Sequence, residues 1–250
     1  MLSPWQLAVL AVAGFAAGAV NGVAGGGSLI SFPALLAMGY PPVTANVTSA
    51  LTTLPGYVGG LAGYRAELAE VRPRIRQLTA VTAAGAAAGA LILLAAPAER
   101  FTSVVPVLVL ASVIALAAQG VVARRLARAE TAAGHGRGLL LATFVVSAYG
   151  GYFAAGLGVM MLALLGAFIA EDLHRLNALK SALSLVVGVV SALSFAVFGP
   201  VQWLPVAVMS LAGLAGGRSG VVIARRVPPQ RLRWLVVGVG LVLSIALFMR

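Results

Sequence analysis

Eight long apolar tracts divide this 250-residue chain, and they restrict its possible folds more than any other feature. Six of them are long enough to cross a membrane as one helix, which takes about 20 residues. These six lie at roughly 44–64, 76–96, 102–123, 176–198, 203–224 and 231–249. With 61% hydrophobic and only 9% charged residues, a water-soluble fold could not bury so much apolar surface. The sequence therefore predicts an all-α integral membrane protein.

The other two tracts, 5–38 and 138–170, are too long for one straight helix, and glycine interrupts both. The first is interrupted at 24–28 by Ala-Gly-Gly-Gly-Ser (break 1), and the second at 154–158 by Ala-Ala-Gly-Leu-Gly (break 2). Backbone outside a helix cannot face lipid, because each unpaired amide in hydrocarbon costs several kcal/mol. We therefore expect each tract to be a hairpin of two shorter helices, with its break buried in protein or lining a wet cavity.

Basic residues between the apolar tracts give an orientation, because arginine and lysine favour cytoplasmic loops. Arginines crowd three gaps, near 65–76, 124–137 and 218–233, which we place in the cytoplasm. The gaps at 39–42, 96–100 and 199–202 are placed outside. The net charge of +11 then indicates contact with anionic membrane lipid, and no nucleic-acid partner is expected. The expected location is a bacterial-type cytoplasmic (inner) membrane, which the chain crosses many times.

An internal repeat becomes visible when the chain is shifted against itself by 131 positions. The shift pairs Asn46 with Asn177 and brings many glycines into register. Other identical pairs are Ala24 with Ala155, Gly25 with Gly156, Gly27 with Gly158, Gly85 with Gly216, Gly89 with Gly220, Pro97 with Pro228 and Arg100 with Arg231. Each half then holds a glycine-broken helical hairpin and three transmembrane helices: repeat 1 at about 5–123 and repeat 2 at about 138–250, with a cytoplasmic linker at 124–137. Because the charge pattern orients the halves oppositely, we predict two inverted-topology repeats in a single transmembrane domain.

The two breaks are candidates for a substrate site. A new helix begins after each break, so its free amides and positive dipole end point toward the break, which suits a small anion. The residues concerned are Gly25, Gly26, Gly27, Ser28, Gly156 and Gly158. Alternatively, the glycines only permit close helix packing. Because the breaks occupy matching positions of two inverted halves, we favour the site.

Five polar residues near the helices after the hairpins are further candidates. Asn46 and Asn177 could cap those helices, contact the substrate, or do both. Thr48 and Ser49 belong to a run of hydroxyls that could coordinate an oxyanion or a cation, or bond back to their own helix. Lys180 is the only lysine, and a cation inside a span is a functional candidate unless it snorkels to the interface.

Other kinds of site have less support. Glu171, Asp172 and His174 could resemble a metal cluster, but they share a short interfacial loop with Arg175, so no metal site is expected. Break 1 lacks the lysine of a phosphate-binding loop. No pair of carboxylates lies inside the predicted spans, so we expect neither an enzyme nor a cofactor.

Two groups of motifs carry a family resemblance. Residues 14–39 read GFAAGAVNGVAGGGSLISFPALLAMG and 45–49 read ANVTS, while the second half has GYFAAGLGVMM at 151–161 and EDLHRLNALK at 171–180. These motifs resemble the sulfite exporter TauE/SafE family, also called the toluene sulfonate uptake permease family. The resemblance implies a permease for sulfite, sulfonates or other organic anions, and it points to the glycines, asparagines, hydroxyls and lysine named above. Asn21 departs from the acidic residue expected in many relatives, which argues against proton coupling through that position.

The sequence thus predicts a secondary transporter for small anions, sulfur-containing or organic, that works by alternating access at a midplane site. An anion channel would keep the same site but leave a continuous pore. In a membrane scaffold protein, the breaks would instead be packed against other helices without water, and no substrate would be transported. A coupling ion, either a proton or sodium, and a homo-oligomer are left open.

Overall fold

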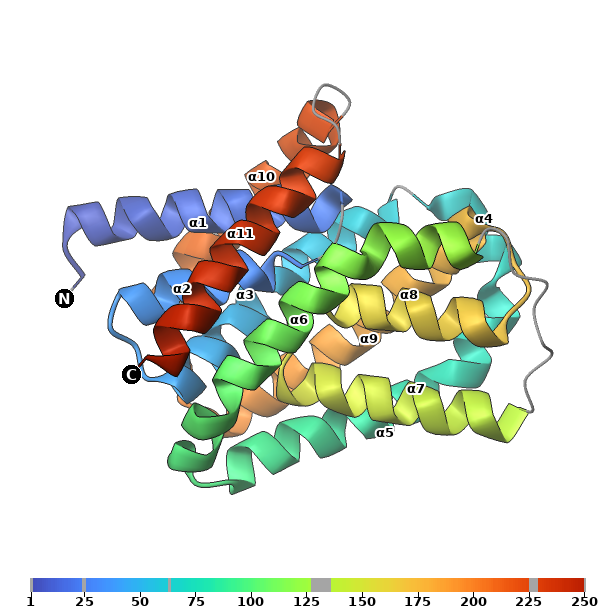
Figure 1. Ribbon diagram of the computed structural model, residues 1–250, viewed down its shortest axis with the longest axis horizontal. Helices are drawn as coiled ribbons and strands as arrows, with labels where there is room; N and C mark the ends of the chain where they lie inside the picture. Colours follow the sequence, from blue (N-terminus) through green and yellow to red (C-terminus); the bar gives the residue numbers. More distant parts are fainter. Residues whose placement is uncertain (1, 24–25, 63, 127–135, 225–228, 250) are drawn as a thin grey trace.

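The computed structural model describes residues 2–23, 26–62, 64–126, 136–224 and 229–249, and within these ranges the chain is helical with short connections (Figure 1). The first half contains α1 (Pro4–Val23), α2 (Ser28–Ala37), α3 (Pro42–Ala62), α4 (Arg65–Glu70), α5 (Arg72–Ala95) and α6 (Ala98–Leu126). The second half contains α7 (Gly136–Tyr152), α8 (Leu157–Phe168), α9 (Leu173–Phe198), α10 (Trp203–Ala224) and α11 (Pro229–Phe248). The predicted all-α class is confirmed.

Both glycine-broken tracts fold as helical hairpins. α1 packs against α2 and α7 against α8, and the chain doubles back between the helices of each pair (Figure 1). The first hairpin is less even than predicted, because α1 has 20 residues and α2 has only 10. α1 is therefore about 30 Å long, as long as a full span. Its apolar run extends from Leu7 to Val20 without a proline or a charge, so nothing in it shortens the helix.

The six predicted spans correspond to α3, α5, α6, α9, α10 and α11. Within the described residues, four segments are long and apolar enough to cross a membrane by themselves, namely Pro4–Asn21, Arg72–Ala95, Ala98–Ala118 and Leu173–Phe198. α6 continues to Leu126, beyond the predicted end at 123, and the rest of the predicted linker lies mostly outside the described residues. The short helix α4 was not predicted, and it packs against α9.

The helices of the two halves interlock. α1 lies along α10, α5 along α7, α3 against α9, and α6 against α11. Glycines make the first two contacts close: a Cβ at Gly18 would overlap the backbone of Gly213, and one at Gly151 would overlap that of Ala86. Small residues allow helices in membranes to approach in this way. Close packing therefore explains the glycines inside these helices.

Glycine occurs at the breaks for a different reason, which is the conformation of the backbone. Gly26 has a φ of 101° and Gly156 a φ of 75°, in the left-handed region that side chains with a Cβ rarely adopt. A Cβ at Gly26 would meet nothing closer than 3.8 Å, so lack of space does not demand glycine there. The backbone turn demands it, because the chain must reverse direction within a few residues.

Candidate functional site

A small cavity lies between the two breaks. Its volume is about 40 Å³, which exceeds the roughly 10–15 Å³ that one water molecule needs. From the first half it is lined by Asn21, Gly26, Gly56 and Tyr57, and from the second half by Ala154, Gly158, Lys180, Ser181 and Ser184. Of the predicted site residues, the structure thus brings Gly26, Gly158 and Lys180 to one cavity.

Lys180 is the charged side chain among the residues that line this cavity. It lies on α9, and its Nζ donates to Asn177 Oδ1 one turn earlier, at 2.9 Å. An ammonium group has three donors, so two N–H groups remain available. Asn177 is half-buried, and its Nδ2 donates to the carbonyl of Leu173. Its side chain therefore links Lys180 to the first turn of α9.

Break 2 turns the start of α8 toward this lysine. Gly156 is the N-cap of α8 in the left-handed conformation, and no side chain caps the helix. The first amides of a helix have no acceptor within it, and they create a positive local potential. A Cβ at Gly158 would meet only the Cδ of Lys180, at 4.0 Å, so the cavity reaches directly to the backbone there. A helix N-terminus and an ammonium group therefore face the same space.

Side chains of α3, α6 and α7 satisfy carbonyl groups at break 2 and at the end of α7 just before it. Asn46 Nδ2 donates to the carbonyl of Tyr152 at 2.9 Å. The hydroxyl of Tyr149 donates to the carbonyl of Ala155 at 2.7 Å, and Ser112 lies 2.8 Å from that hydroxyl. These bonds meet the requirement that backbone inside a membrane be paired within the protein. Carbonyls at break 2 and at the end of α7 are thus held by side chains, while Gly158 in the first turn of α8 lines the cavity.

Break 1 is closed by its own hairpin. The amide of Gly27 donates to Asn21 Oδ1 at 2.8 Å. Asn21 comes from the end of α1 and also lines the cavity. Gly25, a predicted site residue, lies outside the described residues, and Ser28 is buried in the first turn of α2.

The predicted hydroxyl run on α3 lies away from the cavity lining. Thr48 Oγ1 accepts from the amide of Gln202 at 3.1 Å, which fastens α3 to the link before α10. Ser49 bonds to Ser31 of α2 at 2.6 Å. Farther along α3, Thr52 and its neighbour Thr53 donate to carbonyls of their own helix, the alternative that the sequence left open. The hydroxyls of this run thus bond α3 to α2, to the link before α10 and to its own backbone.

The capping interpretation of the asparagines is wrong. Asn46 and Asn177 lie inside α3 and α9, each four residues past the first helical position. Asp172 caps α9 instead, since its carboxylate accepts from the amides of His174 and Arg175, at 2.8 and 3.1 Å. These backbone bonds, that from Arg175 first, lower the pKa of Asp172. A carboxylate competes better than a neutral amide for a helix N-terminus because of the helix dipole.

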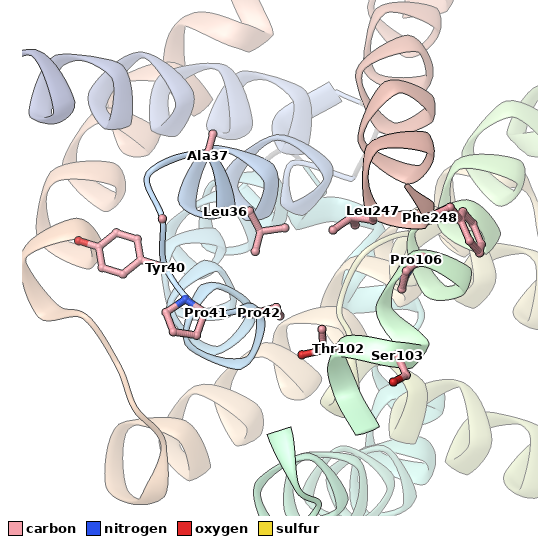
Figure 2. Close-up of a pocket in the computed structure, with 11 residues that line it drawn as sticks. Leu36, Ala37, Tyr40, Pro41, Pro42, Thr102, Ser103, Pro106, Leu247 and Phe248 are labelled. Atoms are coloured by element: carbon pink, nitrogen blue, oxygen red, sulfur yellow. The ribbon is translucent and has the colours of Figure 1, made fainter. Parts of the chain in front are cut away.

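A larger pocket lies at the other end of the molecule, where α2 turns into α3 (Figure 2). Its volume is about 740 Å³, and α6 and α11 complete its walls. Leu36 and Leu247 face each other across it, and the hydroxyls of Thr102 and Ser103 already donate to carbonyls of their own helix. No charged side chain is among its lining residues. The smaller cavity is therefore the better candidate for binding a charged solute.

Sequence reasoning did not place six of the lining residues in the site: Asn21, Gly56, Tyr57, Ala154, Ser181 and Ser184. Ser184 could have been found, because it lies four residues after Lys180 and so shares its face of the helix. Tyr57 gave no such signal, since only the packing of α3 against α9 brings it to the cavity.

The fold defines a polytopic helical membrane protein with a cavity between two helix breaks. The chain belongs to the sulfite exporter TauE/SafE family, whose model matches residues 10–247. It is similar to the probable membrane transporter protein ORF9 of a Sinorhizobium species, with 35% identity over 109 residues, 42% of this chain and 40% of that relative. It is also similar to the probable membrane transporter protein YfcA of Escherichia coli K12, with 26% identity over 98% of this chain and 90% of the relative. No solved structure matches the chain significantly. The protein is therefore a membrane transporter, and the resemblance seen in its motifs is confirmed.

Proposed function

We propose that this transporter carries small anions and that the cavity between the breaks is its binding site. The observation that carries the proposal is Lys180, the one charged group in the lining. No carboxylate of the described residues pairs with it. A cation inside a span is costly unless it has a partner. A bound anion supplies that partner, and the start of α8 adds to the attraction.

The two halves of the chain are inverted repeats in this proposal, and the helix boundaries support it. Three pairs of helices begin 131 residues apart: α3 and α9 (173 − 42), α5 and α10 (203 − 72), and α6 and α11 (229 − 98). The packing is also matched, since α1 lies on α10 as α7 lies on α5, and α2 contacts α11 as α8 contacts α6. The first hairpin opens toward one end of the molecule and the second toward the opposite end (Figure 1).

Alternating access follows from a difference between the halves. Asn46 holds the carbonyl of Tyr152, whereas its counterpart Asn177 bonds within α9. The counterpart of position 152 is Asn21 (152 − 131 = 21). If the halves exchange conformations, Asn46 releases break 2 and Asn177 takes up the carbonyl of Asn21. Motion of one repeat against the other around a fixed midplane site is the usual route of transport in such folds.

Several contacts join the helices toward the end with uncharged loops. The Ser31–Ser49 and Thr48–Gln202 bonds tie α2, α3 and the α9–α10 link together there. The ring of Phe32 on α2 packs edge-on against Phe153 of the second tract, with centroids 5.4 Å apart. Toward the basic end, Asn177 is only half-buried beside Lys180. By the charge rule, this basic end is cytoplasmic in a bacterial-type inner membrane.

The test is thermal stability of the purified protein with sulfite, sulfate, sulfonates and carboxylates, followed by flux into liposomes. A ligand at about 100 times its dissociation constant adds about 2.7 kcal/mol to folding, enough for a clear shift in Tm. We expect a shift with one class of anion and its loss in Lys180→Ala. Arg74→Ala is the matched control, because it removes one positive charge from an exposed site at the start of α5. No shift and no flux with any anion would overturn the proposal.

Two further measurements separate the alternatives. Counter-substrate should accelerate saturable uptake by a transporter, whereas a channel would conduct without such stimulation. The absence of cysteine allows single cysteines at Arg74 and Thr102, exposed at the starts of α5 and α6, to be labelled from opposite sides of the membrane. The same liposome assay under proton or sodium gradients identifies the coupling ion.

A further inference from the structure

One serine of α9 behaves differently from the others. Ser181, Ser191 and Ser194 each donate to the carbonyl four residues earlier, at 2.7 to 2.9 Å. Ser184 is 2% exposed, yet its hydroxyl has no hydrogen-bond partner within the described parts of the chain. A serine inside a helix ordinarily bonds back to that helix. Ser184 instead lines the cavity one turn past Lys180, and its buried hydroxyl has no partner there.

We infer that Ser184 binds the transported anion directly and, together with Tyr57 and Lys180, selects a small anion of single charge. This inference rests on the proposed function and names the ligand class of the same site. Buried polar groups are nearly always paired. Of the four buried hydroxyls without a partner in the described residues, those of Thr82, Thr143, Ser147 and Ser184, only Ser184 belongs to a residue that lines this cavity. The geometry here supplies a place for a partner, because the cavity is large enough for a ligand.

The groups around the cavity mostly donate hydrogen bonds. Lys180 has two N–H groups left, and Ser184 and Tyr57 have hydroxyl donors. Among the described residues, the Tyr57 hydroxyl has no hydrogen-bond partner either. The carboxamide oxygen of Asn21 is already bound to the amide of Gly27. A ligand that fills this space must therefore offer several acceptors, which a compact oxyanion does.

The charge and the volume of the cavity restrict the kind of ligand further. The lining carries one cation, so a dianion would keep one charge uncompensated in a poorly hydrated site. The volume of about 40 Å³ matches about three water molecules. Such a space takes a compact anion of a few non-hydrogen atoms and excludes an aromatic ring. Formate and methanesulfonate are both small and singly charged. Sulfate carries two charges, and benzenesulfonate is too large.

The test is isothermal titration of the purified protein in detergent with these four anions. We expect saturable binding of formate and methanesulfonate, at least tenfold weaker binding of sulfate, and no saturation with benzenesulfonate. Ser184→Ala should weaken methanesulfonate binding about 10- to 100-fold, the usual worth of a hydrogen bond to a charged group. Without ligand, its Tm should stay the same or rise, because the substitution removes an unpaired buried group. Ser184→Thr keeps the hydroxyl and should recover part of the affinity.

Ser191→Ala is the matched control. Ser191 is equally buried on the same helix, but its hydroxyl donates to the carbonyl of Val187, away from the cavity lining. Its loss should leave anion affinity unchanged. Equal affinities in wild type and Ser184→Ala, or sulfate or benzenesulfonate binding as tightly as methanesulfonate, would overturn this inference alone. A wild-type protein that binds and transports no anion would overturn the proposed function as well.

Discussion

The two glycine breaks occupy matching positions of the sequence, yet they satisfy their backbones in opposite ways. At break 1 an amide, that of Gly27, donates to the side chain of Asn21. At break 2 a carbonyl, that of Tyr152, accepts from Asn46, and the helix start that follows faces Lys180 across the cavity. Backbone groups inside a membrane need partners, so each break must be completed by something. The comparison teaches that the protein itself pairs the amide of Gly27 at break 1. In the proposed function, a ligand completes the positive helix start after break 2.

The largest expected effect comes from placing a carboxylate at position 21, where it would compete with the anion for Lys180. In Asn21→Asp the new carboxylate still accepts from the amide of Gly27, but it lines the same cavity as Lys180. It should pair with that lysine and displace the anion. We expect anion affinity to fall more than 100-fold, about 3 kcal/mol, with the fold retained. Titration with methanesulfonate measures the effect.

The control for that substitution is Gln77→Glu, which makes the same change of charge on the exposed face of α5. It should leave anion affinity as it is. If Asn21→Asp binds methanesulfonate as well as wild type does, the two breaks do not share one electrostatic site.

Alanine at the left-handed glycines should affect the breaks unequally. Gly156→Ala combines a positive φ with a Cβ only 3.3 Å from Ser112, whereas Gly26→Ala has free space around it. The left-handed conformation costs about 1–2 kcal/mol for a residue with a Cβ. We expect a loss of about 2 kcal/mol for Gly156→Ala and about 1 kcal/mol for Gly26→Ala, measured as the shift in Tm. Equal losses of stability would show that both breaks tolerate alanine equally well.

The two equivalent asparagines should also differ. Asn46→Ala leaves the carbonyl of Tyr152 unpaired in the interior, which should cost about 1.5 kcal/mol. Asn177→Ala removes bonds made within α9 at a half-buried position, so its effect on stability should be within about 0.5 kcal/mol. Denaturation of the two variants side by side checks this. A larger loss for Asn177→Ala would mean that the halves rest in the opposite conformation.

The smallest effect concerns the start of α9. Bonds from the amides of Arg175 and His174 lower the pKa of Asp172, so its charged form favours the folded state. Its contribution is present above the pKa of the unfolded chain and is lost as the pH falls through the lower folded value. Because the carboxylate is exposed, Asp172→Asn should reduce stability slightly at neutral pH and converge with wild type in acid. Tm measured against pH would contradict this if the difference grew as the pH fell.

Local features of the sequence were enough to predict much of the fold. Apolar length located the spans, and the glycines located both hairpins, since each feature acts within a few residues. Lys180 was recognisable because a cation in a span is unusual. Of the roles left open for the asparagines, capping is not found; at α9, Asp172 lies a few residues earlier and holds the helix start better with its charge. The extra helix α4 was not predicted, because its polar, charged sequence has none of the apolar periodicity that marked the others.

The sequence by itself determined that this protein is a helical membrane transporter with two broken hairpins and one intramembrane lysine, because hydrophobic length, glycine and charge act locally. Only the tertiary structure decided which break is already paired and which faces a cavity. It also brought Tyr57 of α3 to Lys180 and left Ser184 without a partner. The approach of Tyr57 to Lys180 and the bond from Asn46 to Tyr152 join helices more than 100 residues apart in the chain. No local pattern specifies which side chain will reach which backbone group.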